Sequence, residues 1–83
     1  MRRFAYTILI HPCDPDEVGY WVEVPSLPGC VTQGDTLEEA VEMARDAIQC
    51  WLMGLQQTGD PIPPSDPHPQ VVLDSRIEVE LAA

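Results

Sequence analysis

The chain has 83 residues, enough for one small domain, and it carries 14 Asp and Glu against 4 Lys and Arg, a formal net charge of −10. Proteins that bind DNA or RNA are usually basic where they neutralise phosphates, so this composition argues against direct nucleic-acid binding by this chain alone. An acidic surface instead favours a solvated exterior or a basic protein partner.

The sequence also argues against a membrane or secreted location. No apolar run reaches the roughly 20 residues that a membrane-spanning helix needs. The short apolar run after Arg2 and Arg3 lacks a cleavage site of the kind that ends a secretory signal. We therefore expect a cytoplasmic protein whose three cysteines are reduced.

Residues 3–11 are the first predicted strand, because apolar side chains recur there at every second position. One face carries Phe4, Tyr6, Ile8 and Ile10. The acidic and proline-containing stretch 12–19 then predicts a turn or a short loop. A connection this short favours a hairpin between the first strand and the next.

The second predicted strand covers residues 20–25 and the third covers residues 29–34, which begin and end with glycine. In the second strand, Tyr20, Val22 and Val24 share one face, and Trp21 and Glu23 share the other. Pro25 ends this strand, since proline cannot donate a hydrogen bond to the sheet.

A helix of about 22 residues is predicted to follow. Thr36 and Glu39 have the spacing of a capping box, and Gly59 with the proline beyond it indicates where the helix ends. The apolar residues at helical spacing that we expect to face the core are Leu37, Ala40, Val41, Ala44, Ile48, Leu52 and Leu55.

The segment 60–70 is rich in proline and predicts an extended linker inside the domain. Residues 75–82 alternate cleanly, with Ile77, Val79 and Leu81 on one face, and predict the fourth strand.

The order β-β-β-α-β predicts an α+β fold of two layers, in which one helix covers one face of a four-stranded mixed sheet. The helix crossover suggests that the fourth strand lies parallel to the first, giving the strand order 3-2-1-4. The other face would then be uncovered, with Leu9, Trp21 and Glu23 on it. The residues that we expect to bind a partner there are Trp21, Glu23, Glu78 and Glu80.

We find no pattern that predicts catalysis, a metal site or a cofactor. The sequence contains no Gly-rich phosphate loop, no H-E-x-x-H and no C-x-x-C. His11 and Cys13 lack a second pair of metal ligands at a suitable spacing. Asp14 and Asp16 are expected to be solvated acids of a surface turn, and Cys30 a small buried thiol.

The stretches "GYWVEVPSLPGCVTQGDTLEEAVEMARDAI" (19–48) and "GDPIPPS" (59–65) closely resemble the HicB-like antitoxin family. The resemblance covers nearly the whole chain. Its matching residues are Gly19, Tyr20, Pro25, Leu27, Pro28, Gly29, Cys30, Gly34, Thr36, Glu39, Ala40, Pro61, Ile62 and Pro63.

The resemblance implies a partial RNase H-like fold without the RNase H active site. It also implies a function, which is to bind a HicA-like toxin, a small basic RNA-cleaving protein, and to neutralise it by covering it. Many family members continue into a DNA-binding domain after the fourth strand. Because this sequence stops at Ala83, we expect a single HicB-like domain over residues 1–83, without direct binding to an operator.

Two other hypotheses remain open from the residues. The chain could be an orphan HicB-like domain, a homodimer or higher homo-oligomer that binds another protein or a small ligand. It could also be a degenerate nuclease that keeps metal-dependent activity through Asp14 and Asp16. The second is disfavoured, because no strand carries the inward-facing carboxylates that such chemistry needs.

Overall fold

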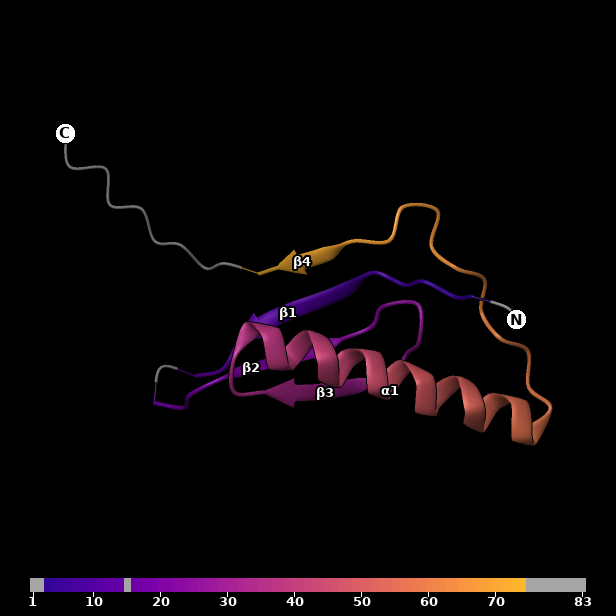
Figure 1. The fold of residues 1–83 in the computed structure, drawn as a ribbon, viewed down its shortest axis with the longest axis horizontal. Helices are drawn as coiled ribbons and strands as arrows, with labels where there is room; N and C mark the ends of the chain where they lie inside the picture. The colour runs from indigo at the N-terminus through magenta and orange to yellow at the C-terminus, as the bar shows by residue number, and fades with distance from the viewer. Residues whose placement is uncertain (1–2, 15, 75–83) are drawn as a thin grey trace.

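The computed structural model describes residues 3–14 and 16–74 and contains one sheet and one helix (Figure 1). In chain order the elements are β1 (Ile8–Pro12), β2 (Tyr20–Glu23), β3 (Val31–Gly34), α1 (Leu37–Thr58) and β4 (Val71–Leu73). The strand order is β3-β2-β1-β4. β1 and β3 are antiparallel to β2, and β4 is parallel to β1. The predicted α+β class, mixed sheet and strand order are confirmed.

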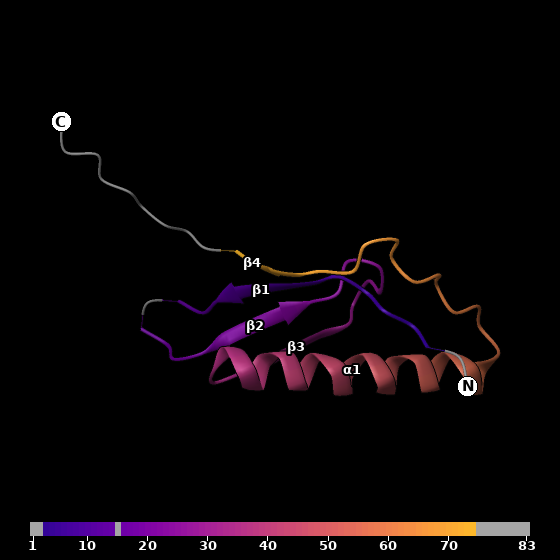
Figure 2. The same ribbon diagram turned by 45° about the horizontal axis from the view of Figure 1, so that its top comes forward.

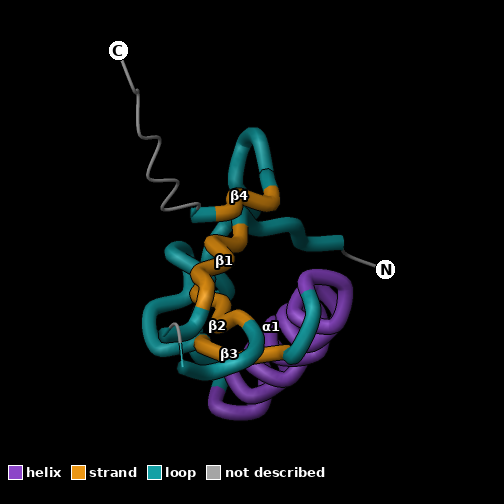
Figure 3. The backbone as a smooth tube through the Cα atoms, turned by 90° about the vertical axis from the view of Figure 1, so that its left-hand side faces the viewer, coloured by secondary structure: helices purple, strands orange, loops and turns teal. Residues whose placement is uncertain are grey.

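The helix packs on one face of the sheet, mainly over β3 and β2, and the opposite face has no helix (Figures 2 and 3). The core between the two layers follows the predicted two-residue period. Ile8, Ile10 and Val22 are buried, and the small residues Ala40 and Ala44 of α1 pack against them. Two small residues on the buried side of the helix let its backbone approach the sheet closely.

Both predicted ends of the helix are confirmed. At the N-terminus, the backbone N–H of Glu39 donates to Oγ1 of Thr36 over 3.0 Å. At the C-terminus, Gly59 adopts a left-handed conformation with φ 76° and caps the last turn. The prediction that Leu37 belongs to the core was wrong. It is 41% exposed, because it begins the helix before the buried stripe of Ala40 and Ala44.

The loop between β2 and β3 is longer than predicted. β2 ends at Glu23 and β3 begins at Val31, because residues 24–30 bond to one another as turns. The N–H of Leu27 donates to the carbonyl of Val24, and the N–H of Cys30 donates to the carbonyl of Leu27. Leu27 is fully buried, so this loop contributes to the core.

The predicted first strand begins too early, because residues 5–7 bond to the proline-rich segment. Ala5 donates its backbone N–H to Oγ of Ser65 over 3.0 Å. The hydroxyl of Tyr6 donates to the carbonyl of Pro63 over 2.6 Å. Burial, and then the nearby carboxylate of Asp66, raises the pKa of Tyr6, which keeps this hydroxyl a donor. The segment 60–70 is therefore a strap held against the start of the chain.

Asp66 is the centre of this strap. One carboxylate oxygen accepts from the hydroxyl of Ser26 and the other accepts from the backbone N–H of Thr7, each over 2.6 Å. Its own N–H donates to the carbonyl of Ala5. The bond from Ser26, followed by that from Thr7, lowers the pKa of this carboxyl below its ordinary value. The Asp66 side chain thus joins the strap to Thr7, the residue before β1, and to the loop after β2.

The structure contains a strand, β4, at Val71–Leu73, where the sequence predicted none. The strand parallel to β1 is Val71–Leu73, and it follows the strap directly. The N–H of Gln70 donates to Oγ1 of Thr7 over 3.1 Å, and the N–H of Ile8 donates to the carbonyl of Gln70 over 3.0 Å. These bonds align the two strands where the strap ends. The predicted strand 75–82 lies outside the described residues.

Gly34 is a point of very close approach between the sheet and the helix. A Cβ atom at this position would lie 2.5 Å from the backbone nitrogen of Ala40 and 2.8 Å from its Cα. No real Cβ tolerates such distances, and both atoms belong to the helix backbone. Gly54, in contrast, lies in the exposed part of α1 and has no atom within 4 Å of its would-be Cβ.

We expect Gly34→Ala to destabilise the protein by about 1–3 kcal/mol or more, because the helix must move away from the sheet. Gly54→Ala is the matched control. It should stabilise the protein by about 1 kcal/mol, since alanine favours the helix and meets no neighbour. Urea unfolding of both variants measures the difference, and equal stability of the two would contradict this contact.

We expect Asp66→Asn to lower the melting temperature at neutral pH. The asparagine NH2 group would take the place of one carboxylate oxygen and would face the N–H of Thr7 or the hydroxyl of Ser26, which are both donors. The folded-state pKa of Asp66 is lowered, so its contribution is present above the ordinary value of 3.8 and is lost as the pH falls through the folded value. The difference from the unsubstituted protein should therefore shrink in acid. Asp16→Asn, in an exposed turn, should show neither effect.

Candidate functional site

The uncovered face of the sheet presents the outward side chains of β1 and β2 together. In the antiparallel register, His11 lies opposite Trp21 and Leu9 lies opposite Glu23. Side chains of directly opposite residues share a face and are close enough to interact. Trp21 is 37% exposed, so much of this large ring stays in contact with solvent.

His11 organises this face. Its ring stacks on the indole of Trp21, with 4.1 Å between the ring centres and 20° between the planes. Nδ1 lies 2.9 Å from a carboxylate oxygen of Asp74, and Nε2 lies 3.3 Å from a carboxylate oxygen of Glu23. Each ring nitrogen of His11 thus lies beside a carboxylate oxygen, which is a hydrogen-bond acceptor.

This arrangement connects three strands of the sheet. His11 belongs to β1, Trp21 and Glu23 belong to β2, and Asp74 directly follows β4. The stack and the two carboxylates hold the indole in one orientation over the sheet. We call these four residues the Trp21 cluster. It combines an exposed aromatic ring with two partly exposed acids, a surface that suits apolar and cationic side chains of a partner.

The predicted partner-binding residues divide into two groups. Trp21 and Glu23 lie together on the uncovered face, where they were expected, while Glu78 and Glu80 lie outside the described residues. His11 and Asp74 also belong to this face, which we did not predict from the sequence. The position of His11 could have been predicted, because it lies two residues after Leu9 in the same strand and therefore shares the face of Leu9.

Several signature residues shape the loops around this face. Gly19 and Gly29 have φ values of 117° and 95°, which favour glycine. A Cβ on Gly29 would lie 3.2 Å from the ring of Trp51, so this loop packs closely on α1. Tyr20 begins β2, and Pro25 and Pro28 lie in the turns before β3. Each has a conformational or packing role.

The structure does not bring the candidate catalytic or metal-binding residues Cys30, Asp14 and Asp16 together into a reactive site. Cys30 is buried, and burial raises the pKa of its thiol, which opposes formation of the nucleophilic thiolate. Asp14 and Asp16 are exposed in the turn after β1. Within residues 3–14 and 16–74, no three metal-ligating side chains gather at one point.

The helix gives no indication of membrane insertion. Over the part of the chain that the structure describes, no helix has both the length and the apolar character to cross a bilayer.

Comparison with known proteins identifies relatives over most of the chain. A family model described as the HicB_like antitoxin of bacterial toxin-antitoxin systems matches residues 6–78. A protein of Photorhabdus laumondii named Antitoxin HicB 1 is 34% identical over 79 residues, which are 95% of this chain and 50% of that protein. A UPF0150 protein of Thermoplasma acidophilum is 42% identical over 59 residues, or 70% of this chain and 81% of its own length.

A third relative, an uncharacterised 14.9 kDa protein of Haemophilus phage HP1, is 41% identical over 54 residues, or 65% of this chain. The matched part spans only 41% of that phage protein, as it spans half of the Photorhabdus antitoxin. The family model nevertheless covers both layers of the fold, from Tyr6 in the core to beyond β4. The chain therefore belongs to the HicB-like antitoxin family of bacterial toxin-antitoxin systems.

Proposed function

We propose that this protein is an antitoxin-type binding module, without enzymatic activity of its own, that neutralises a HicA-like RNA-cleaving toxin by covering it. The observation that carries the proposal is the family match over residues 6–78, and the relative named Antitoxin HicB 1 supports it. The net charge of −10 suits a small basic partner, because opposite charges steer association and disfavour wrong partners. We place the protein in the cytoplasm, where such a toxin would act.

The surface that best suits this partner is the uncovered sheet face around the Trp21 cluster. Exposed tryptophan is enriched among the residues that dominate binding energy, and acids around it select cationic neighbours. One face of the indole is occupied by His11, and the exposed remainder is available to a guanidinium or an apolar side chain. Glu78 and Glu80 remain predicted contributors from outside the described residues.

His11 prepares this surface for binding. Because its ring is stacked on Trp21 and bonded at both nitrogens, the indole loses little rotational freedom when a partner binds. Holding a binding group in its bound orientation raises affinity by reducing the entropy lost on association. His11 therefore acts on the partner through Trp21.

We also propose that the chain forms a homodimer. β4 is an apolar strand at the end of the sheet, and none of α1 lies over it. A domain of this size buries a small core, so association adds stability that one copy lacks. An orphan family member without a toxin would keep this property.

The antitoxin role is tested by co-expression with a neighbouring small basic toxin. We expect the toxin to co-purify with the chain and to lose its toxicity. We expect Trp21→Ala to weaken the complex by about 2 kcal/mol or more, roughly 30-fold, as for a residue central to an interface. The same change should lower folding stability by only about 1 kcal/mol, since the ring is partly exposed.

Met53→Ala, at an exposed position on α1, is the control for that measurement and should change neither quantity. A toxin that neither co-purifies nor loses toxicity would refute the antitoxin role. If Trp21→Ala unfolds the chain while the remaining folded fraction binds normally, the ring belongs to the core and the binding surface lies elsewhere.

We expect His11→Ala to weaken toxin binding by about tenfold, because Trp21 is no longer held in place. Folding stability should fall by about 1 kcal/mol, because an aromatic stack and the hydrogen bonds to Glu23 and Asp74 are lost. His68→Ala, on the exposed strap, should leave both unchanged. Binding can be measured by calorimetry, and unaltered affinity in His11→Ala would show that the stack has no part in recognition.

A further inference from the structure

β4 is an unguarded edge of the sheet. Among residues 3–14 and 16–74, it pairs with β1 on one side only and ends the strand order. All three of its residues are apolar and exposed, Val71 by 60%, Val72 by 38% and Leu73 by 45%. Natural proteins usually protect such an edge with charges, prolines, a covering element or a very short strand, because it can pair with another strand. β4 has three residues and so is short, but none of the three is charged or a proline.

The backbone groups that β4 leaves unused can be assigned from its bonds to β1. The N–H of Ile8 donates to the carbonyl of Gln70, and the N–H of Asp74 donates to the carbonyl of Ile10. In a parallel pair, alternate residues turn their N–H and C=O toward the neighbour, so residues 70, 72 and 74 face β1. The N–H and C=O groups of Val71 and Leu73 therefore point away from the sheet.

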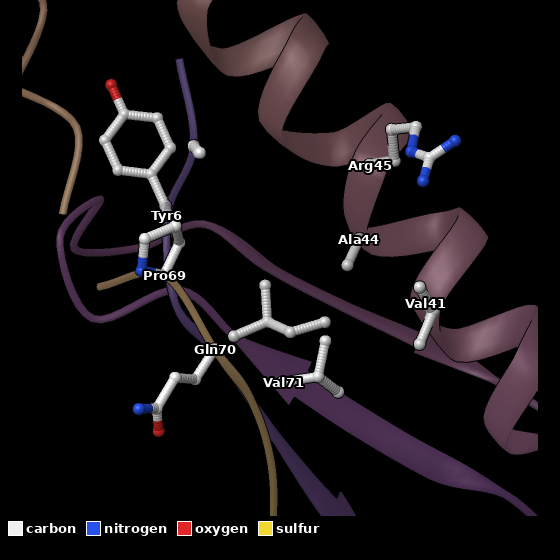
Figure 4. A pocket seen from close by; sticks show the side chains of 9 residues that line it. Tyr6, Val41, Ala44, Arg45, Pro69, Gln70 and Val71 are labelled. Carbon is white, nitrogen blue, oxygen red and sulfur yellow. The ribbon is translucent and has the colours of Figure 1, made fainter. Parts of the chain in front are cut away.

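The helix side of this edge is also unfilled. A pocket of about 280 Å³ lies beside β4, and Ile8, Val41, Ala44 and Val71 are among the residues that line it. Figure 4 shows Val41 and Ala44 of α1 on one side of the gap and Val71 on the other. Since Val71 and Leu73 alternate with Val72, both lie on the helix side, where apolar cover is missing.

We propose that a second copy of this chain covers the edge, by antiparallel pairing of β4 with β4 about a two-fold axis at Val72. Val72 then lies opposite Val72 of the second copy, and Val71 lies opposite Leu73 of the second copy. The outward N–H and C=O groups of Val71 in one copy then meet those of Leu73 in the second copy. Each such pair is a hydrogen-bonded pair of an antiparallel ladder. The two sheets join into one, and the axis makes the contact closed and self-complementary.

The charges near the edge agree with this register. Two copies that each carry −10 repel, so an interface must avoid opposing carboxylates. Asp74 comes to lie opposite the neutral Gln70 of the second copy, whose amide can donate to it. A register centred on Asp74 would instead place two carboxylates face to face. Pairing about Val72 thus joins apolar residues and separates the acids.

This inference rests on the proposed homodimer and names its interface. A two-fold axis perpendicular to the joined sheet keeps both helices on one side and both Trp21 clusters on the other. The dimer therefore leaves both copies of the proposed toxin-binding face accessible, on the same side of the joined sheet. Self-association and toxin binding become separable by substitution.

Val72→Cys tests the register directly, with Cys13, Cys30 and Cys50 replaced by serine or alanine. Residues directly opposite in a non-hydrogen-bonded antiparallel pair approach the distance that a disulfide needs. We expect mild oxidation to link Val72→Cys into a covalent dimer. Val31→Cys, exposed on the opposite edge strand β3, is the matched control and should remain unlinked.

Leu73→Pro gives a second test by sedimentation. Its N–H points away from β1, so proline removes a donor that only the dimer uses and leaves the β1 ladder intact. We expect the dimer dissociation constant to rise about tenfold or more, while the folded content by circular dichroism is retained. Val31→Pro on the other edge strand should leave dimerisation unchanged.

The outcomes separate this interface from the broader proposals. An unsubstituted chain that is monomeric at high micromolar concentration would overturn both the homodimer and its interface. A dimer that neither links through Val72→Cys nor weakens in Leu73→Pro would overturn the β4 interface alone. The toxin should still co-purify with both variants, because neither substitution lies in the Trp21 cluster. Co-purification therefore tests the antitoxin role independently of the β4 interface.

Discussion

The contact between Gly34 and the backbone of Ala40 determines how the two layers of this protein meet. At that point β3 ends and α1 passes so closely that no side chain fits between them. The helix is thereby held over β3 and β2, and Ala40 and Ala44 complete the close packing. With the helix fixed there, the described residues leave two surfaces without cover: the opposite face of the sheet, and β4 at its far edge. Both surfaces proposed for binding follow from that one constraint.

The proline-rich strap is the second requirement of the fold. Its prolines cannot form a ladder, so its position depends on the hydroxyl of Tyr6 and the carboxylate of Asp66. Those bonds direct Val71–Leu73 along β1 and so create the parallel pair that extends the sheet. The same alignment brings Asp74 to His11, which in turn supports Trp21. The strap thus affects the binding face although it lies at the other end of β1.

The parts of the fold that depend on neighbours in the chain could be predicted from the sequence. Alternation placed Ile8 and Ile10 in the core, Thr36 and Gly59 marked the helix ends, and the faces of β2 separated Trp21 from Val22. The errors concern choices made over long distances in the chain. Val71–Leu73 shows no alternation, and bonds of Thr7 set this short strand beside β1: the N–H of Thr7 donates to Asp66, and its hydroxyl accepts from the N–H of Gln70. The pairing of His11 with Trp21 depends on the register across the turn, which no periodicity in one strand reveals.

The two uncovered surfaces have different chemistry, and this difference argues that they serve different partners. The edge of β4 offers unused backbone groups and three apolar side chains, which an identical strand complements without opposing charges. The Trp21 cluster offers an aromatic ring between two acids, which a basic protein complements and a copy of this acidic chain does not. Joining two copies at β4 would place two such clusters on one side of a continuous sheet. Toxin molecules would then meet a doubled negative field, which raises their rate of encounter without any new contact.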